Sequence, residues 1–243
     1  MLGRGRSRHE GLEFLTVVTY GRTGSTVLQS ALNSLPGVLV RGENYGALRG
    51  LRDYVQSVAG TADRHHAGRP DHPWYGSARL EPATVVASLR EHVVSTLLRP
   101  RRDTRIVGFK EIRYEPGHFP DYDVLLDYLL FLNTLLPGMR YLVNVRDAQE
   151  AGRSGWWPGN ANATDVLTTA RQWLEDATAD LTRILGPRRA VCIAYEEWNA
   201  RPEVVIDAFA ALGLPANDAG VRSAVGARLA HGPHAPQGAV DGG

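Results

Sequence analysis

The chain has 243 residues, 43% of them hydrophobic, and its 27 lysines and arginines nearly balance 26 acidic residues, for a net charge of +1. This length favours one domain with a sizeable core, and the charge balance argues against a surface built to bind nucleic acid. The single cysteine excludes an internal disulfide framework.

The composition also bears on location and on one unusual residue. No basic region followed by an apolar secretory stretch opens the chain, and no run of about eighteen apolar residues follows. We therefore expect a cytoplasmic protein with no membrane span. Arginine supplies 26 of the 27 basic residues. The one lysine, Lys110, either occupies a position that needs a compact ammonium or is present there by chance.

The two ends of the chain differ from its middle. Residues 1–11 are basic and glycine-rich without periodicity, and residues 226–243 are rich in glycine, proline and histidine. We expect both ends to be flexible, or the second to act as a closing flap. A single domain is predicted over 12–225.

The domain begins with a predicted strand, a glycine loop and a helix. Residues 13–20 are a short apolar, β-branched run, and apolar side chains at helical spacing follow over 26–35. A second strand is expected over 38–40 and leads into Glu43.

Strand and helix patterns then alternate along the chain. We expect helices over 45–58, 83–98, 124–136, 164–185 and 202–212, strands over 105–109, 139–145 and 190–195, and irregular segments over 60–78 and 152–162. This order predicts an α/β fold, a three-layer sandwich with a central, mostly parallel sheet flanked by helices. Ligands of such sheets bind at the carboxyl ends of the strands.

The glycine loop, in TYGRTGST over 19–26, is a candidate anion site. A strand that turns into a helix through glycines points backbone N–H groups and the positive helix end at one place. The spacing is shorter than in the GxxxxGK[ST] loop of nucleoside triphosphatases, and its lysine is missing. An ordinary strand-to-helix connection is the alternative.

A second candidate follows the strand YLVNV, which ends at Arg146. An arginine at a strand end can fork onto a phosphate, and Ser154 is spaced to complete the same pocket. The alternative is a surface salt bridge from Arg146 to Asp147 or Glu150.

Together these segments resemble the sulfotransferases that use 3′-phosphoadenosine 5′-phosphosulfate (PAPS), especially their bacterial, carbohydrate and tyrosyl-protein branches. TYGRTGSTVLQSALNSLPGV is similar to the element that binds the 5′-phosphosulfate, and VRDAQEAGRS is similar to the arginine and serine pair on the 3′-phosphate. CIAYEEWNARPEVVIDAFAALGLP resembles a late strand and helix of the family. A counterpart of the family's glycine-rich segment over the cofactor is missing.

The resemblance implies a P-loop-like sulfotransferase fold and a set of cofactor contacts. These are Gly21, Arg22, Thr23, Gly24, Ser25, Thr26, Arg146 and Ser154. The cofactor would be PAPS and the product PAP, and the acceptor a hydroxyl of a small molecule or glycan.

The resemblance also places a catalytic glutamate after the second strand, where this chain has Glu43. An unperturbed glutamate, with a pKa of about 4.3, is a weak base, so we expect burial or a neighbouring carboxylate to strengthen it. The alternative role is a carboxylate at a helix start.

Two further charged residues, Lys110 and Glu111, are expected at the same edge of the sheet. Lys110 and Arg22 would stabilise the transferring sulfonate and the leaving phosphate. Glu111 would orient Lys110, or would itself be the base in place of Glu43.

No metal is expected, because no acidic strand end is arranged to hold Mg²⁺ beside the glycine loop. His65, His66 and His72 lie in a polar segment without metal-ligand spacing. Trp156 and Trp157 are predicted to wall the acceptor or adenine pocket, or to anchor their loop.

The sequence thus predicts a PAPS-dependent sulfotransferase, and the arginine-rich composition favours a bacterial natural-product or glycolipid pathway. Two alternatives stay open: a nucleotide kinase-like phosphotransferase, which would need Mg²⁺ and ATP, and a non-catalytic nucleotide-binding module.

Overall fold

A parallel sheet forms the centre of the molecule, for which a computed structural model describes residues 11–64 and 68–227. Its strands are β1 Glu13–Thr19, β2 Val38–Arg41, β3 Ile106–Glu111, β4 Arg140–Val145 and β5 Ala190–Ala194. Their order is β2-β3-β1-β4-β5, and every neighbouring pair is parallel. The predicted α/β fold with a mostly parallel sheet is confirmed.

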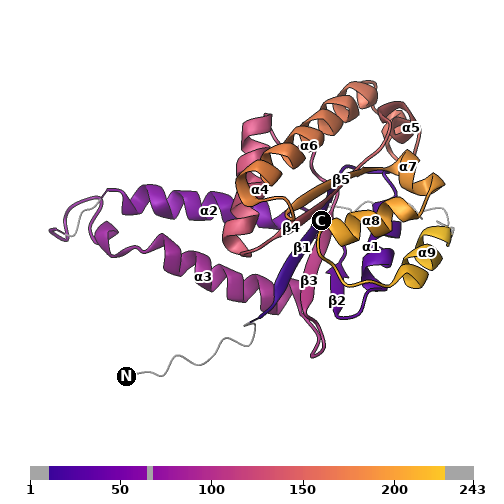
Figure 1. The fold of residues 1–243 in the computed structure, drawn as a ribbon. Coiled ribbons are helices and arrows are strands. Elements are labelled where there is room, and N and C mark those ends of the chain that lie inside the picture. The colour runs from indigo at the N-terminus through magenta and orange to yellow at the C-terminus, as the bar shows by residue number, and fades with distance from the viewer. Residues whose placement is uncertain (1–10, 65–67, 228–243) are drawn as a thin grey trace, which may run out of the picture.

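Helices cover both faces of this sheet (Figure 1). They are α1 Ser25–Asn33, α2 Ala47–Ala62, α3 Pro82–His92, α4 Tyr122–Leu135, α5 Ala148–Gly152, α6 Ala163–Leu185, α7 Tyr195–Ala200, α8 Glu203–Ala211 and α9 Asp218–Gly226. Shorter helical turns lie at Ser77–Arg79, Val93–Leu98 and Trp157–Gly159. Within the described ranges, no helix has the length and apolar character needed to cross a bilayer.

Alternation along β1 separates the core into two layers. Leu15 and Val17 pack with α1, α8 and α9, while Phe14 and Val18 belong to the cluster that contains α4 and α6. Because both faces of β1 are buried, its sequence reads as a continuous apolar run.

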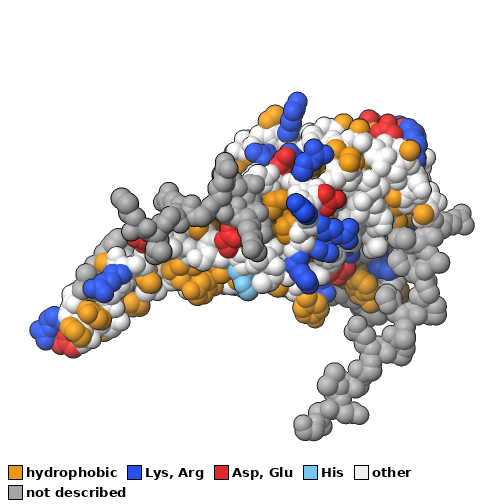
Figure 2. Space-filling model, turned by 90° about the horizontal axis from the view of Figure 1, so that it is seen from below, with side chains coloured by type: hydrophobic (Ala, Val, Ile, Leu, Met, Phe, Trp, Pro, Cys, Tyr) orange, Lys and Arg blue, Asp and Glu red, His pale blue; other side chains and the backbone are white. Residues whose placement is uncertain are grey.

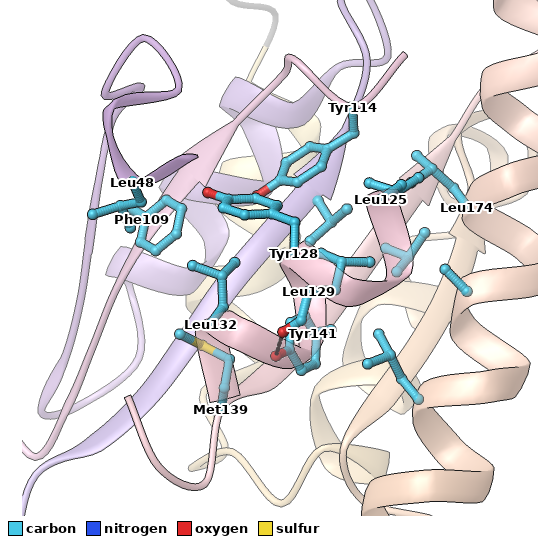
Figure 3. Packing of buried hydrophobic residues seen from close by; sticks show 14 of the residues in the cluster. Leu48, Phe109, Tyr114, Leu125, Tyr128, Leu129, Leu132, Met139, Tyr141 and Leu174 are labelled. Atoms are coloured by element: carbon cyan, nitrogen blue, oxygen red, sulfur yellow. Dashed lines mark hydrogen bonds between the residues drawn. The ribbon is translucent and has the colours of Figure 1, made fainter. Parts of the chain in front are cut away.

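The second layer contains buried tyrosines as well as leucines (Figure 3). Tyr114 and Tyr128 lie with ring centroids 6.2 Å apart, and the Tyr141 hydroxyl donates to the Leu129 carbonyl at 2.6 Å. Phe109 of β3 belongs to the same buried cluster.

Helices α2 and α3 pack side by side and project from the sheet as an arm (Figure 1). Hydrophobic side chains lie along its surface (Figure 2), including the exposed Tyr54, Trp74, Tyr75 and Leu80. The arm begins directly after the second strand, so its base lies beside the edge where ligands are expected.

The structure corrects several predicted boundaries in the first half of the chain. The helix expected over 45–58 is α2, which starts at Ala47 and continues to Ala62, so the irregular segment expected from residue 60 starts later. Gly60 does not end the helix, because neither side of it carries a competing turn residue. The helix expected over 83–98 changes at Val93 into a wider turn with π-type hydrogen bonding.

Further corrections concern elements near the strand ends. β3 was expected to end at Phe109 but includes Lys110 and Glu111, since charged side chains are tolerated where a buried strand reaches a polar site. The helices α5, α7 and α9 were not predicted: α5 and α7, with five and six residues, are too short to show a period, and in α9 only Val221 is buried, so its apolar pattern is weak. The expected flexibility of residues 1–10 and 228–243 lies outside the described residues.

Candidate active site

One cavity opens at the carboxyl ends of the central strands. It has a volume of about 750 Å³, which is within the range of small-molecule sites. Its lining comes from distant parts of the chain: Arg22, Gly24, Ser25, Thr26, Val27, Glu43, Lys110, Ile112, Arg146, Trp156, Tyr195, Trp198, Asn199, Val225 and Ala227.

The glycine loop, residues 20–24, forms one wall of this cavity. Arg22 and Gly24 both have positive φ angles, 71° and 77°, which turn the backbone sharply before α1 begins at Ser25. A Cβ on Gly24 would lie 2.8 Å from the Tyr195 ring and 2.9 Å from that of Trp198. Only glycine therefore fits at position 24, where the loop packs against α7. The first residues of α1, Ser25 and Thr26, border the cavity.

Buried hydrogen bonds fix the conformation of the glycine loop from below. The Asn144 amide donates to the Thr23 carbonyl at 2.8 Å and accepts from the Trp198 indole at 2.8 Å. The hydroxyls of Thr19 and Thr23 are 2.7 Å apart, and Thr19 also donates to the Asn144 carbonyl. Asn144, Thr19 and Thr23 are completely buried and uncharged, so the loop rests on a neutral polar network.

Arg146, at the end of β4, faces the same loop. Its guanidinium donates to the Arg22 carbonyl at 2.9 Å and lies 4.3 Å from the centroid of the Tyr195 ring. The Tyr20 hydroxyl bonds both the N–H and the carbonyl of Arg146, which fixes its backbone. The Nε atom of Arg146 is buried and has no hydrogen-bond partner among the described residues.

The alternative role of Arg146, a salt bridge with Asp147 or Glu150, is not formed in the described part of the chain. Asp147 instead caps α5 by accepting from the Glu150 N–H at 2.9 Å. Glu150 pairs with Arg153 at 2.9 Å. The Arg146 guanidinium is therefore available to an anion in the cavity.

Ser154 reaches the glycine loop through Arg22. The Arg22 Nε donates to the Ser154 hydroxyl at 3.0 Å, and the guanidinium lies 6.0 Å from the centroid of the Trp156 ring. A Cβ on Gly21 would lie 2.4 Å from the same indole, so Trp156 rests directly on the loop. Arg22 thus joins the two segments that resemble phosphate sites.

Charged side chains form the opposite side of the cavity. Lys110 Nζ donates to Glu43 Oε1 at 2.6 Å, and Arg113 lies 3.3 Å from the other Glu43 oxygen. The Glu43 side chain is 33% exposed, whereas that of Lys110 is 6% exposed. The direct contacts of Glu43 are thus with two cations, whereas the sequence predicted either burial or a neighbouring carboxylate.

Glu111 does not contact Lys110 in the way the sequence suggested. Its carboxylate is buried and accepts hydrogen bonds from the backbone of the β2–α2 loop, from Ile112 and from Arg113. Burial works against ionisation, but these bonds and the Arg113 charge together hold the pKa of Glu111 below its usual value. Glu111 is fully occupied within the fold and does not line the cavity.

The predicted site residues thus divide into three groups. The first group borders the cavity and comprises Arg22, Gly24, Ser25, Thr26, Glu43, Lys110 and Arg146. Gly21 and Thr23 support its wall from behind, and Ser154 acts through Arg22. Of the tryptophans, Trp156 lines the cavity, whereas Trp157 is buried in the core.

Clusters of acidic or histidine side chains, which a metal site would need, are missing from the described residues. Within residues 11–64 and 68–227, no group of three or more histidine, cysteine, aspartate or glutamate side chains could hold a metal ion. His65 and His66 lie outside the described residues.

Several residues of the site were missed by sequence reasoning. Asn144 was visible as a polar residue in the apolar run YLVNV, a signal of a buried hydrogen-bonding role. Tyr195 and Trp198 follow the last strand and obey the strand-end rule. Val225 lies in α9 and Ala227 directly follows this helix, which the local sequence pattern did not predict.

No protein-family model matches the chain, and no curated protein matches its sequence. Solved structures do match. The sulfotransferase domain from the Synechococcus PCC 7002 olefin synthase is 18% identical, with 89% of this chain and 78% of that chain covered and a TM-score of 0.53. The sulfotransferase domain from the curacin biosynthetic pathway is 16% identical, with coverages of 85% and 75% and a TM-score of 0.47. The olefin synthase match shows that this chain has the fold of a sulfotransferase domain.

Proposed function

We propose that this protein is a PAPS-dependent sulfotransferase that acts on a hydroxyl group of a small-molecule or carbohydrate-like acceptor. The observation that carries the proposal is that two candidate anion-binding segments, far apart in sequence, meet in one cavity with Glu43 and Lys110. The shared fold with a sulfotransferase domain supports it independently.

The residues at the cavity fit a nucleotide with two separate anionic ends. The glycine loop and the N-terminus of α1 offer N–H groups for a 5′-phosphosulfate. Arg146, which lines the cavity, offers its guanidinium to a 3′-phosphate, and Ser154 holds the neighbouring Arg22 in place. Arg22, between the two, is within reach of both segments.

The adenine end has aromatic walls in place of the missing glycine-rich segment. Tyr195 and Trp198 meet edge-on, with centroids 4.9 Å apart, and both border the cavity. Val225 and Ala227, at the end of α9, complete this side. Such a surface suits a purine ring, which is flat and largely apolar.

The charged side of the cavity supplies the acid–base chemistry. When bound, PAPS would supply the sulfonate for transfer from its phosphate oxygen to the acceptor oxygen, with PAP as the leaving group. Glu43 accepts the proton of the acceptor hydroxyl. Lys110 can exchange Glu43 for an anionic group in the cavity, which frees the carboxylate for that role and places positive charge where negative charge develops.

Calorimetric titration with PAP, followed by a transfer assay with labelled PAPS and a panel of hydroxylated acceptors, tests the proposal. We expect PAP to bind without added metal, and Glu43→Gln to bind PAP normally but to lose activity by roughly 10²–10⁴-fold. Absence of both PAP binding and PAPS turnover would contradict the proposal. Mg²⁺-dependent ATP binding would favour the phosphotransferase, and PAP binding without any turnover would favour the non-catalytic module.

A further inference from the structure

Glu111 is a buried carboxylate that the proposed reaction does not use directly. It ends β3 and is only 2% exposed. A buried charge is costly unless it is paired and hydrogen-bonded. Its surroundings therefore indicate what it does for the fold.

The Glu111 carboxylate has a donor on every side. Oε2 accepts from the N–H groups of Asn44 at 3.2 Å and Gly46 at 2.8 Å. Oε1 accepts from the Ile112 N–H at 2.8 Å and from Arg113 at 2.7 Å. Each oxygen therefore serves a different segment: one serves the β2–α2 loop, and the other the end of β3.

The loop that Glu111 holds adopts an unfavourable conformation. Tyr45 and Gly46 are both left-handed, with φ angles of 59° and 69°, and a tyrosine rarely adopts this region without support. Arg113 stacks on the Tyr45 ring, with its guanidinium carbon 4.1 Å from the centroid. The residue directly before this loop segment is Glu43.

We propose that Glu111 is the positioning residue for Glu43. It acts through the backbone of residues 44–46 and through Arg113, which contacts both carboxylates. This inference rests on the proposed function, since it assigns a role within the same site. It replaces the expectation that Glu111 orients Lys110 or is the base.

Glu111→Gln tests the role with a change of one atom. An amide has a single acceptor oxygen, whereas both Glu111 oxygens face donors. Whichever way the amide turns, its NH₂ group meets N–H groups on one side. The variant must therefore release either the 44–46 loop or the link through Arg113.

Glu115→Gln is the matched control. Glu115 is also a largely buried carboxylate, four residues further along, but its contact is with His118 at 3.3 Å, and its Oε2 has no partner among the described residues. It therefore undergoes the same chemical change without contact with the loop that carries Glu43.

We expect Glu111→Gln to lower kcat by roughly 10- to 100-fold, with PAP affinity and the KM for PAPS changed by less than about threefold. The amides of Asn44 and Gly46 should exchange with solvent roughly 10- to 100-fold faster. Glu115→Gln should change none of these quantities. Should Glu111→Gln not fold, Glu111→Asp, which keeps the charge but withdraws the carboxylate by one methylene, carries the same expectations.

The outcomes separate this inference from the proposed function. If the wild-type protein shows neither PAP binding nor transfer, the proposed function fails, and amide exchange alone decides whether Glu111 holds the loop. If the wild-type protein is active and the Glu111 variants keep both its kcat and its slow exchange at Asn44 and Gly46, the positioning role is wrong. Equal losses in the Glu115 control would also overturn it.

Discussion

The two sides of the cavity are built from different kinds of interaction. The glycine loop rests on Thr19, Thr23 and Asn144, which are uncharged and completely buried. The opposite side rests on charged side chains: Lys110 pairs with Glu43, and Arg113 bridges Glu43 and Glu111. A neutral hydrogen-bond network keeps the same geometry as the pH and the salt concentration change, whereas the members of a charged network can exchange partners. Under the proposed function, the first side would bind the cofactor and the second would transfer the proton.

The largest effect is expected on the charged side. Lys110→Met keeps the length and apolar stem of the side chain but removes the ammonium that contacts Glu43. We expect kcat to fall by about 10²–10³-fold, the loss typical of one preorganised donor. Steady-state transfer assays measure this fall in kcat. A kcat within about threefold of wild type would contradict the proposed contrast between the charged and the neutral side.

On the neutral side, the main expected effect is on stability. Asn144→Ala leaves the Thr23 carbonyl and the Trp198 indole buried without their partner. The free energy of unfolding should fall by about 2–4 kcal/mol. Urea unfolding checks this, and because the network is uncharged, the loss should be the same at low and high salt. A strong salt dependence would contradict the assignment.

Cofactor affinity should depend on Arg146 more than on its neighbours. Arg146→Met removes the guanidinium that faces the cavity, and we expect PAP to bind roughly 10- to 100-fold more weakly. Arg153, seven residues along and 72% exposed, pairs only with Glu150 among the described residues. Arg153→Met should therefore leave the affinity unchanged in the same calorimetric titration.

The smallest effect concerns Glu115, whose pKa burial raises to about 7. The folded protein then binds a proton more tightly than the unfolded chain, so stability is lost as pH rises from about 4.5 to about 7. Glu115→Gln removes this loss. It should stabilise the protein by about 1–3 kcal/mol near pH 8 and hardly at all near pH 4.5. Equal effects at both pH values would rule out titration of Glu115 as the cause.

Much of the sheet was predictable because its strands are buried on both faces. Runs such as residues 14–20 and 141–145 consist mainly of apolar, aromatic or β-branched residues, and glycines mark turns between strand and helix. The helices at 124–136 and 164–185 were predicted within two residues at each end. The short helices α7 and α9 were not predicted, because their positions depend on packing against α8 and α1 rather than on periodicity.

The candidate site was partly predictable for a related reason. Glu43, Lys110 and Arg146 lie at or just beyond the carboxyl ends of parallel strands, and the strand-end rule brings such residues to one edge. The rule says nothing about which of them pair. That Glu111 bonds the 44–46 loop, and that Lys110 bonds Glu43, follows from distances that only the assembled fold provides.

The strand order also has a consequence for how the chain is made. β1 lies at the centre of the sheet, and its partners β3 and β4 come from residues 106–111 and 140–145. More than half of the chain must leave the ribosome before both edges of β1 are covered. Until then the backbone N–H and C=O groups along both edges of this apolar strand lack their partner strands. Slow folding and a need for chaperones during synthesis are therefore expected.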